Sequence, residues 1–216
     1  MKLAIKQKLS KMGILPYIDV VRRLPQISRW IGTGCVGMAP LPVKRMIISA
    51  YMRHFDLHQF IETGTHFGDT LAYVAHDKSV MCTSIELADS YYQAAMQRFA
   101  SYANVTLIQG DSGTVLPEFV HNLLAPALFW LDGHYSGGIT ARGDLDTPVS
   151  AELQAIMDSH QTHVILIDDA RLFNGTNSYP HLDVLLNTVR EKAVYHAEVS
   201  ADIIRLVAIK RPFDFV

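Results

Sequence analysis

The chain has 216 residues, of which 49% are hydrophobic and 19% are charged. These proportions predict one domain with a substantial buried core, and no apolar run is long enough to cross a bilayer. The first residues lack the apolar stretch of a secretory signal, and the two cysteines, Cys35 and Cys82, have no CxxC spacing. We therefore expect a cytoplasmic protein without a disulfide framework or a zinc site.

The charge is distributed unevenly along the chain. The formal net charge is −2, yet residues 1–53 contain ten Lys and Arg against one acidic residue, and the remaining residues are strongly acidic. Such asymmetry is typical of a basic arm that binds an anionic surface or partner. The alternative, which we favour, is a solvated, positively charged lid that complements an acidic domain.

Residues 1–50 are predicted to form a basic helical N-terminal extension, and residues 51–216 the main domain. Proline inside a helix removes a hydrogen-bond donor and clashes with the preceding turn. We therefore expect short helices joined by bends in the extension. The residues that predict these bends are Pro16, Pro25, Pro40, Pro42, Gly32, Gly34 and Gly37.

From residue 57 onward, short apolar runs alternate with longer amphipathic segments, which is the pattern of βαβ units. The predicted strands cover 57–62, 80–86, 105–109, 127–131 and 163–167. Helices are predicted from about residue 69, and over about 89–101, 113–124, 148–159 and 180–192. The strand at 127–131 is almost wholly apolar, which predicts a central place in the sheet.

The last two strands, at 193–199 and 202–209, are too close in sequence for a crossover helix between them. They should therefore pair antiparallel. The expected fold class is α/β: a Rossmann-like, mostly parallel seven-stranded sheet that ends in an antiparallel hairpin, with helices on both faces. Such a hairpin is less usual in dinucleotide-binding domains.

Ligands of open parallel sheets bind beyond the carboxyl ends of the strands, so those ends are the candidate site. The first strand ends in a turn in which Gly64 and Gly68 let the backbone approach a ligand closely. The second ends in Glu86, which is suited to accept hydrogen bonds from both ribose hydroxyls. The third is followed by Asp111 and Ser112, which offer polar groups to an adenine edge.

Acidic residues also follow the fourth and fifth strands, as Asp132 and as the pair Asp168 and Asp169. Each strand end alone is a weak signal, because glycine turns are common and an acid at a strand end usually caps a helix. Suitable groups at five strand ends are much less expected by chance. Asp111 argues against NAD, because a dinucleotide fold needs no acid at that place.

These residues carry a family resemblance over about residues 59–175. The sequence resembles the class I S-adenosylmethionine-dependent methyltransferases, and locally the metal-dependent catechol and caffeoyl-CoA type O-methyltransferases and uncharacterised methyltransferases of bacterial polysaccharide loci. The resemblance implies a cofactor site in which Gly64 and its neighbours lie close to the methionine part of S-adenosylmethionine. Thr70 would bind the methionine carboxylate, and Glu86 the ribose. The cofactor-binding residues that it implies are Glu62, Gly64, Thr65, Gly68, Thr70, Glu86, Asp111, Ser112 and Asp132.

The resemblance also implies a magnesium ion held by Asp132, Asp168 and Asp169, since three oxygen donors suit a hard cation. The alternative is that one of these acids caps a helix and another pairs with Arg171 or Arg142. The family's lysine base after the fourth-strand aspartate is absent here. The implied catalytic residues are therefore His134 and Asp168 as proton acceptors, together with Asp132.

The expected function is methyl transfer from S-adenosylmethionine to the hydroxyl of a small molecule, with a sugar among the candidates. One alternative is an NAD(P)-linked oxidoreductase or epimerase, although the chain lacks its GxGxxG turn and Tyr-x-x-x-Lys pair. Another is a non-catalytic nucleotide-binding domain. A nucleic-acid acceptor is not expected, because the basic charge lies in the extension. That extension could serve as a lid, as a homodimer contact or as a peripheral membrane contact.

Overall fold

The computed structural model of the chain describes residues 15–133, 147–192 and 194–209, with side chains from Val20 onward. Within this part, seven strands form one sheet in the order β3-β2-β1-β4-β5-β7-β6. Their bounds are β1 Gln59–Thr63, β2 Met81–Glu86, β3 Val105–Gln109, β4 Leu128–Leu131, β5 Val164–Ile167, β6 Tyr195–Ser200 and β7 Ile203–Ala208.

The sheet has the mixed pairing that the sequence predicts. β1 pairs parallel with β2 and with β4, and the β2–β3 and β4–β5 pairs are also parallel. The hairpin strand β7 is antiparallel to both β5 and β6. The central place of the fourth strand is confirmed, because β4 is the middle strand and all four of its residues are buried.

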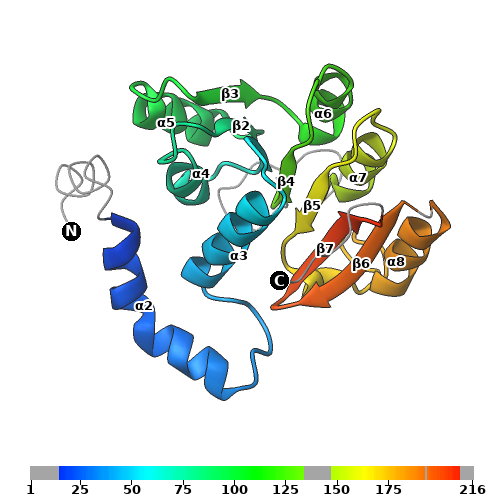
Figure 1. Ribbon diagram of the computed structural model, residues 1–216, viewed down its shortest axis with the longest axis horizontal. Helices are drawn as coiled ribbons and strands as arrows, with labels where there is room; N and C mark the ends of the chain where they lie inside the picture. The colour runs from blue at the N-terminus through cyan, green and yellow to red at the C-terminus, as the bar shows by residue number, and fades with distance from the viewer. Residues whose placement is uncertain (1–14, 134–146, 193, 210–216) are drawn as a thin grey trace.

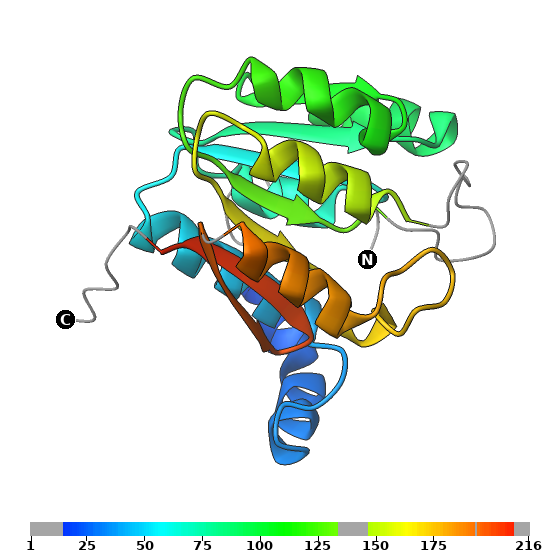
Figure 2. The ribbon, with the colours of Figure 1, turned by 90° about the vertical axis from the view of Figure 1, so that its right-hand side faces the viewer.

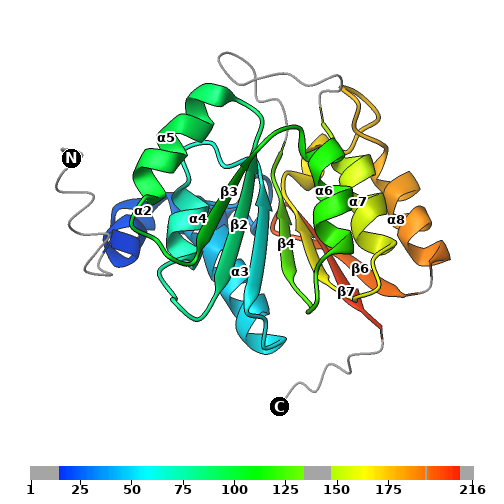
Figure 3. The same cartoon turned by 90° about the horizontal axis from the view of Figure 1, so that it is seen from above.

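Helices cover both faces of the sheet, which confirms the predicted layers (Figure 3). One face carries α3, α4 and α5, and the other carries α6, α7 and α8. The bounds of the helices are α2 Leu15–Gly32, α3 Leu41–His54, α4 Asp69–Val74, α5 Asp89–Phe99, α6 Ser112–His121, α7 Val149–Met157 and α8 Leu182–Glu191, with a short 3-10 helix η1 at Ala170–Leu172.

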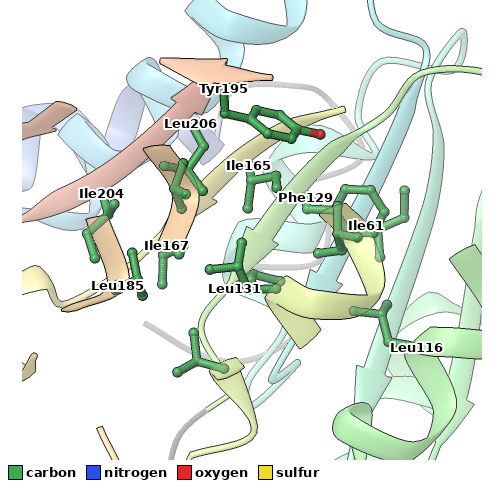
Figure 4. Packing of buried hydrophobic residues seen from close by; sticks show 14 of the residues in the cluster. Ile61, Leu116, Phe129, Leu131, Ile165, Ile167, Leu185, Tyr195, Ile204 and Leu206 are labelled. Carbon is green, nitrogen blue, oxygen red and sulfur yellow. The ribbon is translucent and has the colours of Figure 1, made fainter. Parts of the chain in front are cut away.

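Alternating side chains of the strands divide the core into two apolar layers. Phe129 of β4 points with Ile61 and Ile165 into the layer beneath α6, α7 and α8 (Figure 4). The neighbouring residue Trp130 belongs to the opposite layer, under α3, α4 and α5. A strand alternates its side chains in this way, so a strand buried on both faces is apolar at every position.

The helix α3 belongs to this core rather than to a separate extension. Its residue Ile48 is fully buried, and Ile48 and Met52 pack in the same layer as Phe60 and Trp130. The predicted division at residue 50 therefore runs through a helix that the domain needs. Pro40 and Pro42 do mark a helix start, since α3 begins at Leu41.

The structure corrects the expected bend at Pro25, because α2 continues through this proline. The proline leaves the carbonyl of Val21 without its helical hydrogen bond. Val21 is 64% exposed, so this turn of α2 is open to solvent. In two perpendicular views α2 projects away from the sheet (Figures 1 and 2). None of the helices in the described ranges is both long and apolar enough to cross a membrane.

Candidate active site

The turn after β1 requires glycine at two positions. Gly64 has a φ of +82°, and a Cβ atom there would lie 2.6 Å from the carbonyl oxygen of Asp132. Gly68 has a φ of +67°, and a Cβ atom there would lie 2.7 Å from the ring of Phe99. The turn thus brings the ends of β1 and β4 into contact, and it lets bare backbone face a ligand.

Glu86, at the end of β2, is tied to this turn. Its Oε2 accepts a hydrogen bond from the backbone N–H of His66, and its Oε1 accepts one from the N–H of Ala88, both at 2.8 Å. Each carboxylate oxygen has a second lone pair, so both can still accept a hydroxyl of a ligand. The two backbone bonds orient the carboxylate before any ligand binds.

Other residues of the predicted cofactor site lie in and below the same turn. Thr65 is buried, with its hydroxyl 2.6 Å from that of Ser84. The Ser84 hydroxyl donates to Glu62 at 2.8 Å. Burial, with the nearby Asp132 and Glu86 charges, raises the pKa of Glu62 to about 8. Thr70, which the resemblance assigns to the cofactor carboxylate, is a partly exposed residue of α4.

Asp111 and Ser112, after β3, have structural contacts of their own. Asp111 caps α6 by accepting the N–H of Gly113 at 2.8 Å, as acids at strand ends often do. The side chain of Ser112 counteracts the rise that burial causes in the pKa of Glu152 of α7. These contacts fix the start of α6 beside the end of β3.

The acids after β5 enclose a lysine from a distant part of the chain. Nζ of Lys44, on α3, lies 2.5 Å from Oδ2 of Asp168 and 3.4 Å from Oδ1 of Asp169. Asp169 is also paired with Arg171, whose Nη1 lies 2.8 Å from its Oδ1. Arg171 forms a second ion pair with Asp202. One of the predicted alternatives, that an acid of this group pairs with Arg171, is therefore present.

Carboxylates are in surplus at this end of the sheet. Asp132 is half-buried, and its carboxyl group lies among many protein atoms. Burial, followed by the charge of Asp169, raises the pKa of Asp132, and burial with the charge of Asp132 raises that of Asp168. The same carboxylates outweigh the effect of burial on Lys44 and raise its pKa, so the lysine stays an ammonium ion at neutral pH.

The arrangement does not fit the predicted magnesium site. Magnesium needs oxygen ligands at about 2.0–2.1 Å in near-octahedral geometry. Here the ammonium of Lys44 already contacts Asp168 and Asp169, and a second cation beside it would be repelled. Over the described parts of the chain, no three His, Cys, Asp or Glu side chains form a metal-binding group. The assignment of Asp132, Asp168 and Asp169 to a metal therefore stays a prediction, which the position of Lys44 does not favour.

A small cavity lies next to these acids. Its wall includes Asp168, Gly133, Tyr179 and Glu152. Glu152 is 1% exposed, and its Oε1 has no hydrogen-bond partner within the described ranges. Burial raises the pKa of Glu152 to about 7. A buried, unsatisfied oxygen is costly, so this cavity is a place for a water molecule or a ligand donor group.

Two predicted positions, His134 and Arg142, lie outside the described residues. Sequence reasoning missed Lys44, although a signal was present. Lys44, Ile48 and Met52 are spaced four residues apart and share one face of α3, which is buried. A lysine in an otherwise apolar stripe predicts a buried acidic partner.

Comparison with known proteins identifies the fold. No protein-family model and no curated protein sequence matches the chain. Among solved structures, an O-methyltransferase from Bacillus cereus in complex with S-adenosylhomocysteine is similar with a TM-score of 0.60 at 12% identity, over 94% of this chain and 97% of the other. A putative caffeoyl-CoA O-methyltransferase from Staphylococcus aureus gives 0.57 at 12% identity, over 89% and 98%.

A 23S rRNA methyltransferase, ErmE, is also similar, with a TM-score of 0.53 at 15% identity, over 82% of this chain and 71% of the other. The similar proteins thus include enzymes named for small-molecule and for RNA acceptors, so the likeness does not select an acceptor. What it establishes, together with the strand order and the antiparallel β7, is the architecture. The chain has the fold of the class I S-adenosylmethionine-dependent methyltransferases.

Proposed function

We propose that this protein transfers the methyl group of S-adenosylmethionine to a hydroxyl group of a small molecule. The observation that carries the proposal is Glu86, whose two oxygens are oriented by backbone N–H groups at the end of β2. The carboxyl end of a parallel sheet is where such folds bind nucleotides, and a paired acceptor at this place suits the two ribose hydroxyls.

The remaining contacts follow from the positions of the strand ends. Gly64 presents bare backbone to the methionine part of the cofactor, next to Thr65, and Thr70 of α4 binds its carboxylate. Asp111 and Ser112 border the adenine. Asp132 lies beside Gly64, between the cofactor and the acids that follow β5.

In the reaction, an acceptor oxygen attacks the methyl carbon in line with the departing sulfur. The new C–O bond forms while the C–S bond breaks, and S-adenosylhomocysteine leaves as a neutral thioether. The hydroxyl proton passes to the carboxylate of Asp168 or to His134. Because the cofactor is already activated, the protein's part is to orient the nucleophile and to accept its proton. The ammonium of Lys44 lies between Asp168 and Asp169, where it offsets their charge.

The NAD(P)-linked alternative is not favoured, because the turn after β1 lacks a GxGxxG spacing and β7 is inserted antiparallel between β5 and β6. A non-catalytic nucleotide-binding domain would share Glu86 and the glycine turn. It would not need the enclosed acids after β4 and β5, whose desolvation is costly.

Thermal unfolding with added ligands tests the proposal. S-adenosylhomocysteine should raise the unfolding midpoint, whereas NAD⁺ at the same concentration should not, because only a ligand that binds the folded state stabilises it. Methyl transfer is then measured with labelled S-adenosylmethionine and a panel of hydroxylated acceptors that includes sugars. Protection by NAD⁺ and not by S-adenosylhomocysteine would contradict the proposal, and binding without transfer to any acceptor would favour the non-catalytic alternative.

A further inference from the structure

The buried ammonium of Lys44 is the unusual feature of this site. Its side chain is 10% exposed, and it reaches Asp168 and Asp169 from a helix that lies 124 residues away along the chain. Placing a lysine among buried carboxylates is costly unless the charges balance. Asp168 and Asp169 contact it directly, and the charge of Asp132 adds to theirs in raising its pKa. The ammonium therefore offsets part of the charge of the buried acids.

We propose that the Lys44 ammonium is the resident cation of this site, so that it takes the position of a divalent metal ion and makes the site independent of metals. It is a positioning group that neutralises Asp168 and Asp169 and holds their carboxylates in place. The part that concerns methyl transfer rests on the proposed function. The part that concerns metal binding does not.

The charges around the lysine support this assignment. Asp169 is shared between Lys44 and Arg171, and Arg171 is held in turn by Asp202. The two cations balance part of the charge of the acids without an added ion. Tyr179, which lines the cavity together with Asp168, contributes no charge while its hydroxyl is protonated. Burial raises the pKa of Tyr179, so it stays neutral.

An ammonium ion has three N–H donors in a compact group. Two of them serve Asp168 and Asp169, so the ammonium takes up the oxygens that a magnesium ion would need as ligands.

Mn²⁺ is the probe that tests the assignment, by electron paramagnetic resonance and calorimetry on the full chain. The wild-type protein should show no stoichiometric Mn²⁺ site tighter than about 1 mM. Its unfolding midpoint should be the same in Mg²⁺ as in a chelator. Lys44→Ala should gain one Mn²⁺ site that binds on the order of tenfold more tightly, and a further Asp169→Asn change should remove it.

Lys192→Ala is the matched control, because it removes a lysine–aspartate pair of similar length, 2.6 Å to Asp158, on the surface. It should gain no Mn²⁺ site. Lys44→Met keeps the length of the side chain without its charge, and it repeats the test if the alanine variant unfolds. A wild-type Mn²⁺ site that Asp168→Asn abolishes would overturn the proposal, and so would lysine variants that gain no site. S-adenosylhomocysteine binding, measured in parallel, separates these results from a failure of the proposed function.

Discussion

Replacing Glu86 by alanine should weaken cofactor binding strongly while the chain still folds. The change removes a carboxylate that would accept two ribose hydroxyls, and a hydrogen bond to a charged group contributes about 1.5–3 kcal/mol. At the lower end, two such bonds amount to about 3 kcal/mol, which weakens binding about 150-fold. Calorimetry with S-adenosylhomocysteine measures this loss directly.

The same variant should also lose some stability without any ligand. The backbone N–H groups of His66 and Ala88 lose their acceptor, and each buried donor without a partner costs about 1–3 kcal/mol. Because His66 is exposed, water can replace its bond, so we expect a total near the lower end, about 1–2 kcal/mol. Urea unfolding of the free protein checks this value.

Two further variants decide how the result is interpreted. Glu86→Gln keeps one acceptor oxygen and should weaken binding less than alanine does. Glu118→Ala removes an exposed glutamate of α6 and should leave both binding and stability unchanged. If Glu86→Ala binds S-adenosylhomocysteine as tightly as the wild type, the ribose contact is assigned to the wrong strand end.

Three other changes test the fold around the site. Burial lowers the pKa of His163 to about 4, whereas the unfolded chain takes up this proton near pH 6.5. The free energy of unfolding should therefore fall by about 1.4 kcal/mol per pH unit as the pH drops from 6.5 toward 4. In urea unfolding, His163→Gln should depend less steeply on pH than the wild type, and equal slopes would contradict the assignment. Gly64→Ala should lower the free energy of unfolding by about 1–3 kcal/mol and abolish S-adenosylhomocysteine binding. Gly32→Ala, where a Cβ atom meets nothing within 4 Å, should change neither stability nor binding. Normal binding by Gly64→Ala would refute the close approach of the backbone to the ligand. Deletion of residues 1–32 should leave a folded, ligand-binding domain. Deletion of residues 1–50 should not, because it removes most of the buried face of α3. Equal thermal unfolding midpoints of the two truncated proteins would support the predicted domain boundary at residue 50.

The sheet could be predicted from the sequence because its signals are local. Apolar runs of strand length alternate with helical segments, and the short connection between β6 and β7 leaves only antiparallel pairing. The continuation of α2 through Pro25 could not be predicted in this way, since it depends on solvent reaching the carbonyl that proline leaves unbonded. Local propensity gives the cost of such a proline but does not show whether the surroundings offset it.

The strand-end acids were found for the same reason, because each directly follows an apolar run. What they contact was not predictable from that pattern. Asp111 caps a helix, and Asp168 pairs with a lysine that lies far away in sequence. A list of oxygen donors does not distinguish a metal site from a buried ion pair, because both need acids in surplus. Only the position of the opposite charge separates them.

The uneven charge of the chain acquires a physical explanation through α3. The basic N-terminal segment was expected to complement an acidic domain as a solvated lid, yet two of its cations, Lys44 and Arg45, are less than a tenth exposed. Lys44 contacts the acids after β5, and the charge of Arg45 lowers the pKa of Glu62 against the effect of burial. Both act on the carboxyl ends of the strands, where the acids are concentrated. At α3, the basic segment therefore complements the acidic domain through buried contacts and not as a solvated lid. This implies that substitutions of these two residues disturb the site itself, whereas substitutions of the exposed arginines of α2, Arg22 and Arg29, leave it intact.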